Sequence, residues 1–331
     1  MTQPRFDVLA IGNAIVDVIA DSTDAFLAEQ GLDKGSMRLI DQAEAVRLYG
    51  AMGPGREVSG GSAGNTAAGL AALGAKAAFV GQVADDELGA IYRHDITAAG
   101  VDFLVDPRSD VGATARSLIL VTPDAQRTMN TFLGAAQMLD ARDIDPAAIA
   151  DAAILYLEGY LWDPDVPRAA MVKAIDAARA AGRKVAFTLS DTFCVDRHRD
   201  GFWKLLDDGR IDILFANEAE ALAMAGTDDI EAAKARLAAA VPLLVVTKSE
   251  RGASAIAGSE RADVPAEPIE RLVDTTGAGD LFAAGFLAGQ ARGLGLEASL
   301  KLGAIAAAEV IQHYGARPEK DLKALAGDLL A

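Results

Sequence analysis

The sequence predicts an α/β fold with a mainly parallel central sheet and helices on both of its faces. Short apolar runs of strand length alternate with alanine-rich segments of helical period, such as Pro167–Ala181 and Ile230–Ala240. This alternation is typical of successive strand–helix–strand units, whose strands pair in parallel. The strand-like runs are Val8–Ile11, Ala77–Val80, Ile154–Leu157, Val185–Leu189, Ile211–Phe215 and Leu243–Thr247. In such sheets ligands bind beyond the carboxyl ends of the strands.

Two regions depart from this alternation and predict a small antiparallel β lid. Met37–Ile40 is a short extended run, and Ala113–Val121 with Arg127–Phe132 reads as a hairpin around residues 122–125. We expect a single domain over residues 1–331, with lid segments near 13–19, 36–41 and 112–133. A lid that closes over a site excludes water, whereas an edge extension of the sheet would have no gating role.

Composition limits the classes of function. The chain has 331 residues, of which 51% are hydrophobic and 24% charged, with a net charge of −17. This acidity argues against a nucleic-acid or anionic-membrane surface, because both need clustered Lys and Arg. Cys194 is the single cysteine, so an intrachain disulfide is excluded and a reducing compartment is favoured. We expect a cytoplasmic monomer or homodimer that acts on a small molecule.

The segment Asp274–Asp280 carries the strongest chemical signal. Its small residues lead into the apolar stretch Leu281–Leu287, which predicts a glycine-rich turn at the start of a helix. The first N–H groups of a helix have no intrahelical partner, and the helix dipole favours an anion there. Asp280 beside that anion suits a general base for a hydroxyl that attacks phosphorus. The structural alternative is a capped turn that opens a core helix.

A second glycine-rich segment, Ser59–Thr66, precedes another helix-like stretch. Its paired glycines allow close approach of a polar ligand, and Ser62 and Asn65 supply hydrogen-bonding groups. The same residues satisfy the G-x-S-x-G pattern of serine hydrolases. That alternative needs a strong strand before Ser62 and a late histidine, for which His313 is the candidate, whereas residues 56–58 predict only a weak strand.

Asn217 and Glu220 follow the run Ile211–Phe215 and lie three residues apart, on one face of a helix that begins there. An amide can bind a phosphate, and a carboxylate can hold Mg²⁺ through water. An N-capped helix with an acidic first turn explains the pair equally well.

Taken in chain order, these segments resemble the two signatures of the ribokinase-like (PfkB) family of carbohydrate and nucleoside kinases. Asp274–Leu287 matches the second signature in full, while Ala84 stands where the first commonly has glycine. Thr247–Gly252 resembles the family's T-x-G-x-x-G nucleotide loop, with Ser249 in place of the middle glycine. The resemblance spans nearly the whole chain and implies a ribokinase-like fold.

The resemblance is strongest to the adenosine kinase branch, through residues 12–17, Arg127 and Phe215–Glu220. It implies an ATP- and Mg²⁺-dependent transfer to the 5′-hydroxyl of adenosine, as in purine salvage, with Asp280 as base. The implied anion hole comprises Gly277, Ala278, Gly279 and Asp280, with Arg127 over the transferring phosphate. The implied substrate residues are Asn13, Asp17, Gly61, Ser62 and Asn65, with Met129 and Tyr160 lining the base pocket. The implied nucleotide residues are Asn217, Glu220, Thr247, Ser249, Gly252, Gly277 and Gly279, with Glu220 holding Mg²⁺ through water and Asp274 and Thr276 bordering a K⁺ site.

Three alternatives stay open at this point. A sugar kinase for ribose or fructose uses a similar acid and glycine loop, and an inosine or guanosine kinase would look much the same. A nucleoside-binding protein without turnover would share the pocket but not the need for Asp280.

Overall fold

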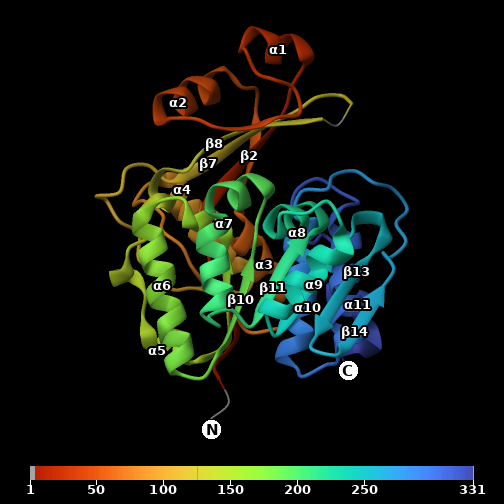
Figure 1. Cartoon of the computed structure of the whole chain (residues 1–331). Coiled ribbons are helices and arrows are strands. Elements are labelled where there is room, and N and C mark those ends of the chain that lie inside the picture. Colours follow the sequence, from red (N-terminus) through yellow and green to blue (C-terminus); the bar gives the residue numbers. More distant parts are fainter. Residues whose placement is uncertain (1–3, 125, 331) are drawn as a thin grey trace.

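A computed structural model describes residues 4–124 and 126–330. It contains two β-sheets (Figure 1). The strands of the large sheet, in spatial order, are β14 (Glu260–Val264), β13 (Ala253–Ala257), β12 (Leu243–Thr247), β11 (Ile213–Asn217), β10 (Lys184–Thr188), β9 (Ala152–Glu158), β1 (Phe6–Ile11), β5 (Ala77–Val80) and β6 (Val101–Phe103). The pairs β12–β13 and β13–β14 are antiparallel, and every other pair of neighbouring strands in this sheet is parallel. The expected mainly parallel α/β sheet is confirmed, and each of the six predicted runs overlaps one of its strands.

The small sheet is built from five strands: β3 (Met37–Leu39), β8 (Arg127–Phe132), β7 (Ala115–Val121), β2 (Ile15–Asp21) and β4 (Gly55–Gly60). The hairpin β7–β8 is antiparallel, as expected, but β2–β7 and β3–β8 pair in parallel. The sequence indicated β4 only as a weak strand over residues 56–58, because these residues carry little strand propensity; pairing with β2 makes them a strand. Ala125, in the predicted turn, lies outside the described residues.

Helices flank the large sheet on both faces. Their bounds are α1 (Asp24–Glu29), α2 (Gln42–Ala51), α3 (Ser62–Ala72), α4 (Glu87–Ala98), α5 (Pro146–Ala150), α6 (Asp165–Ala180), α7 (Thr192–Asp207), α8 (Glu218–Ala225), α9 (Ile230–Ala240), α10 (Ala278–Ala291), α11 (Leu296–Val310) and α12 (Leu322–Ala326). One apolar core joins the sheet to α3, α10 and α11, and a second joins it to α5–α9. Among the described residues, no helix combines the length and apolarity needed to cross a membrane.

The small sheet has one apolar face and a second, partly buried face, which we call the open face because it carries Asp17. Val16, Val18, Leu118 and Leu120 pack with the buried residues of α1 and α2, which cover the sheet on its outer side (Figure 1). Side chains alternate along a strand, so Asp17 and its register partner Ser117 lie on the opposite face. That open face is turned toward the large sheet, on the side away from α1 and α2 (Figure 1).

Close helix packing fixes α10 under this open face. A Cβ at Gly69 of α3 would collide with Leu281, and one at Gly285 would collide with the backbone of Leu302 in α11. Phe286 meets Phe215 of β11 edge to face, with ring centroids 5.6 Å apart. Burying side chains of this size contributes about 1.5–3 kcal/mol each. The start of α10, which carries Asp280, is therefore held against α3 and the sheet.

Candidate active site

Asp280 lies in the first turn of α10 and is held by two side chains of α3. Ser62 Oγ donates to its Oδ1 at 2.7 Å, and Asn65 Nδ2 donates to its Oδ2 at 2.9 Å. Burial raises the pKa of Asp280, against the opposing effect of these two hydrogen bonds and of Arg317. A carboxylate with a raised pKa accepts a proton more readily near neutral pH, which is the property a general base needs. The two glycine-rich segments that the sequence indicated, Ser59–Thr66 and Asp274–Asp280, therefore meet here, although Asn65 and Asp280 are 215 residues apart.

The backbone before Asp280 supplies the anion-binding end of α10. Gly277 is the N-cap in the left-handed region, with φ of 78°, where glycine carries little steric cost. No described side chain caps this helix by a hydrogen bond, so its first N–H groups face outward. The Ala278 N–H is an exception, because it donates to Thr275 O at 3.2 Å. The N–H groups of Gly277, Gly279 and Asp280 are thus better placed for an anion than that of Ala278.

The loop between β4 and α3 is shaped by its glycines. Gly61 has φ of 82°, and a Cβ there would collide with the Asn13 carbonyl oxygen. A Cβ at Gly60 would collide with the Asp17 carboxylate. Burial raises the pKa of Asp17 to about 7, although Arg317 and Arg127 oppose this rise. A second carboxylate therefore lies at the loop, from the open face of the small sheet.

Glu158 is a site residue that the sequence reasoning missed. It ends β9, is fully buried, and its Oε1 accepts the Asn13 N–H at 2.7 Å and Asn13 Nδ2 at 2.8 Å. Its Oε2 accepts the Ala63 N–H at 2.8 Å. Burial raises the pKa of Glu158 to about 7. The signal that could have found it is a carboxylate directly after the run Ile154–Leu157, at the edge where the sheet binds ligands.

Arg127 crosses from the small sheet to the turn before α10. Its Nη2 lies 2.5 Å from Asp274 Oδ2, its Nη1 donates to Thr276 Oγ1 at 3.3 Å, and it stacks over the Tyr314 ring at 5.5 Å. The Arg127 and Asp274 side chains are only 9% and 4% exposed. Arg127 is therefore a buried link between the small sheet and the turn before α10, and not a charge on the surface of a flap.

The donor set does not fit the suggested monovalent-cation site in this conformation. Besides Arg127, the Asp274 carboxylate accepts the N–H groups of Thr276 and Gly315, each at 3.0 Å. A cation site needs several oxygens free to coordinate, and here the Asp274 carboxylate is already satisfied. Within residues 4–124 and 126–330, no group of three or more His, Cys, Asp or Glu residues is arranged to hold a metal ion.

Asn217 and Glu220 form a reciprocal capping box at the start of α8. The Glu220 N–H donates to Asn217 Oδ1 at 2.9 Å, and Glu220 Oε1 and Oε2 accept Asn217 Nδ2 and N–H at 2.6 and 3.0 Å. Glu220 is 5% exposed, and burial raises its pKa to about 7. The geometry matches the structural alternative, an N-capped helix, and the role of Glu220 toward Mg²⁺ stays a prediction.

The nucleotide-loop candidates lie together at the end of β12. Thr247 ends the strand, and Ser249 has φ of 52°, one of two described non-glycine residues with positive φ. This is the position where the family motif has glycine, so Ser249 keeps the backbone shape that the motif requires. Gly252 has φ of 86°, and a Cβ there would collide with the Val264 carbonyl oxygen. Ala84 is not in the left-handed region, so the missing glycine there changes no backbone geometry.

The two base-pocket candidates belong to different sheets, one on a strand of the small sheet and the other just after a strand of the large sheet. Met129 is on β8, where it pairs with Met37 of the edge strand β3. Tyr160 follows β9, donates its hydroxyl to Ser190 O at 3.4 Å, and has a pKa that burial raises. The serine-hydrolase alternative finds no support, because Ser62 bonds to Asp280 while His313 contacts Glu309 on α11.

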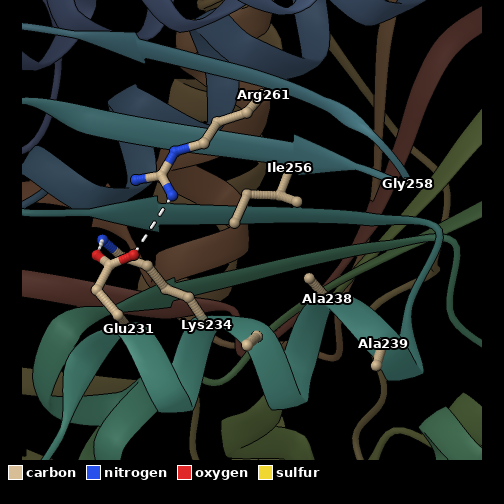
Figure 2. A pocket seen from close by; sticks show the side chains of 8 residues that line it. Glu231, Lys234, Ala238, Ala239, Ile256, Gly258 and Arg261 are labelled. Atoms are coloured by element: carbon tan, nitrogen blue, oxygen red, sulfur yellow. Dashed lines mark hydrogen bonds and ion pairs between the residues drawn. The ribbon is translucent and has the colours of Figure 1, made fainter.

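A hollow of about 480 Å³ lies elsewhere, between α9 and the hairpin β13–β14 (Figure 2). Its charged residues satisfy one another: Glu231 pairs with Lys234 at 2.9 Å and with Arg261 at 3.3 Å. Alanines of α9 form its floor. Because its charges are paired and the rest of its lining from α9 is alanine, nothing indicates a catalytic or binding site in this hollow.

Comparison with known proteins identifies the family of the chain. The model of the pfkB family carbohydrate kinases matches residues 37–322. The chain belongs to this family. It is a kinase, and the family implies ATP as phosphoryl donor and, usually, Mg²⁺.

Three relatives show how closely the chain follows solved and studied members. A structure of a probable sugar kinase from Rhizobium etli is 50% identical, with a TM-score of 0.92 over 98% of both chains. A structure of adenosine kinase from Sinorhizobium meliloti is also 50% identical, with a TM-score of 0.91 over 97% of this chain and 98% of that one. Adenosine kinase from Saccharomyces cerevisiae is 28% identical over 95% of this chain and 96% of its own length.

Proposed function

We propose that this chain is an adenosine kinase that transfers the γ-phosphoryl group of ATP to the 5′-hydroxyl of adenosine. The observation that carries the proposal is the Asp280 carboxylate, fixed by Ser62 and Asn65 at the N-terminus of α10. A base and an anion-binding helix end at one point suit an alcohol that attacks a phosphoryl group. The 50% identity to the Sinorhizobium adenosine kinase supports the choice of substrate.

In the proposed reaction Asp280 accepts the proton of the 5′-hydroxyl as its oxygen bonds to the γ-phosphorus. The bond between the γ-phosphorus and the bridging oxygen breaks, and ADP leaves. The N–H groups at the start of α10 stabilise charge on the transferring group, each worth about 3 kcal/mol in a site without water. Mg²⁺, when bound, neutralises phosphate charge. Ser62 and Asn65 orient the base, and Asp17 is left to accept hydrogen bonds from the ribose hydroxyls.

The open face of the small sheet favours a nucleoside over a bare sugar. Met37 and Leu39 on β3 are 51% and 59% exposed, beside Met129. The strand register places Met37, Met129 and Asp17 on the same face. A flat apolar base can cover these side chains while the ribose reaches Asp17, and closure of the small sheet as a lid would exclude water.

A sugar kinase is the second candidate, favoured by the equal 50% identity to the probable sugar kinase from Rhizobium etli. Purified protein with Mg-ATP should be tested against adenosine, inosine, guanosine, ribose and fructose, with ADP release measured and the product identified by ³¹P NMR. We expect the highest kcat/KM with adenosine and phosphate on its 5′-oxygen. Turnover of fructose or ribose without turnover of adenosine would refute the substrate assignment and leave the kinase chemistry intact.

A further inference from the structure

The segment after α11 brings a second arginine to the loop between β4 and α3. Residues 315–320 are fixed at both ends: the Gly315 N–H donates to Asp274, and Glu309 accepts two N–H groups of residues 319–320 at 3.0 and 2.9 Å. Between these two ends, Ala316 packs closely on Gly277, and a Cβ at Gly277 would collide with the Ala316 side chain. Arg317 therefore starts from a backbone held against the first turn of α10.

The Arg317 guanidinium spans the two ends of the glycine loop. Its Nε and Nη2 donate to Ser59 O at 3.1 and 2.7 Å, and Nη2 also donates to Ser59 Oγ at 2.8 Å. Its Nη1 donates to Gly64 O at 2.8 Å. Ser59 ends β4 with Gly60, and Gly64 lies in the first turn of α3, so one planar group ties the strand to the helix. The residues in between, Gly60–Ser62, form the loop that contacts Asp17 through Gly60.

Asp95 on α4 holds the same strand end from the other side. It accepts the Ser59 N–H at 2.7 Å and Ser59 Oγ at 2.5 Å. Ser59 thus donates its hydroxyl to Asp95 while accepting from Arg317. Ser59 is thus held by two side chains of opposite charge, Asp95 and Arg317. Substituting each in turn separates the effect of holding the loop from the effect of the positive charge.

The positive charge of Arg317 acts on the two carboxylates of the site. In the described part of the chain it makes no direct ion pair, so no single acid neutralises it. Its field lowers the pKa of both Asp17 and Asp280 against burial, which raises them, while burial lowers its own pKa. The other charged and titratable groups that interact with these acids are Arg127, Asp274, Glu158, Tyr92, Tyr156 and Tyr160, while Asp95 interacts with Arg317 itself. Two arginines, Arg127 and Arg317, act on these acids, and Arg127 is already paired with Asp274.

We propose that Arg317 is a positioning residue for phosphoryl transfer, which fixes the Ser59–Gly64 loop and holds a positive charge that offsets Asp17 and Asp280. The role rests on the proposed function, since it concerns the base and the substrate acid of that reaction. Lys would keep the charge but could not bridge Ser59 and Gly64 as a planar fork does. Gln would keep some hydrogen bonding but no charge.

The test compares the pH dependence of kcat/KM in wild type, Arg317→Lys, Arg317→Gln and the control Asp95→Asn. We expect Arg317→Gln to move the acid limb to higher pH by about one unit, a shift typical of losing a nearby opposite charge. Arg317→Lys should keep the wild-type limb and raise KM several-fold. Asp95→Asn loosens the same loop without removing positive charge, so its acid limb should stay or move to lower pH.

Two results would overturn the proposal. One is an Arg317→Gln acid limb at the wild-type pH; the other is an equal upward shift in Asp95→Asn, which would make loop loosening the cause. Circular dichroism and Tm check that each variant folds. If Arg317→Gln does not fold, Arg317→Lys decides alone, since an unchanged KM or a displaced limb contradicts the assigned role. Absence of adenosine turnover in the wild type would refute the proposed function instead, and the limbs would then be measured with the alcohol that is phosphorylated.

Discussion

Replacing Asp280 by Asn changes the protonation chemistry of the site while keeping the shape of the side chain. The new amide oxygen can accept from Asn65 Nδ2, as Oδ2 does at 2.9 Å, and the new amide nitrogen can donate to Ser62 Oγ, because a hydroxyl both donates and accepts. The substitution therefore removes the proposed base and replaces two charge-assisted hydrogen bonds by neutral ones, which are weaker.

Asp280→Asn should lower the rate of catalysis without lowering the stability of the fold. A positioned general base contributes about 10²- to 10⁴-fold in rate, or about 3–5 kcal/mol of activation free energy, so kcat should fall by at least about 100-fold. Burial raises the pKa of Asp280, so the folded protein holds its proton more tightly than the unfolded chain does. The ionised carboxylate therefore opposes folding near neutral pH, and a neutral Asn relieves this while its hydrogen bonds to Ser62 and Asn65 become weaker by about 1 kcal/mol in total. We expect the Tm to stay the same or rise.

The assay is ADP release with Mg-ATP and adenosine, together with calorimetric titration of adenosine and thermal unfolding. Asp212→Asn is a matched control, because Asp212 accepts the Val185 N–H at 2.7 Å and pairs with Arg179 at the amino end of the sheet. The control should lose stability and keep kcat. The reasoning is refuted if Asp280→Asn keeps turnover within tenfold of wild type, or if it loses adenosine binding and Tm together.

Three further predictions concern the surroundings of the base. The pKa of Asp17, about 7 in the folded protein, exceeds the ordinary 3.8, so the contribution of Asp17 to stability falls as pH rises from about 4 to about 7. In urea titrations Asp17→Asn should therefore become more stable relative to wild type across that range. A difference in unfolding free energy that does not change with pH would contradict this. Arg127→Met should lower the free energy of unfolding by about 3–5 kcal/mol, because it leaves the buried Asp274 carboxylate without its ion-pair partner. Adding Asp274→Asn should restore part of the loss, and additive losses in the double-mutant cycle would exclude the buried link. Because Ser249 has positive φ, Ser249→Gly should be about 1 kcal/mol more stable than Ser249→Ala, whereas the opposite order would place this residue in an ordinary loop conformation.

Much of the fold could be predicted because its signals are local. Periodic apolar runs predicted the parallel strands, and Ile230–Ala240 is the helix α9 as expected. The strand β4 was indicated only weakly, because Gly55–Gly60 becomes a strand through pairing with β2, a long-range contact that local propensity does not report. The mixed pairing of the small sheet was hidden for the same reason.

The sequence by itself determined the fold class, the family and the segments that carry the chemistry, since glycine turns and polar residues after strands have recognisable patterns. Only the tertiary structure decided what these residues bond to. It showed that Ser62 and Asn65 hold Asp280, that Arg127 is paired with Asp274, and that Asn217 and Glu220 cap α8. It also brought in Glu158 and Arg317, which no motif marked. Hydrogen bonds and burial depend on neighbours far apart in the chain, and those neighbours exist only once α3, α10 and the two sheets have packed together.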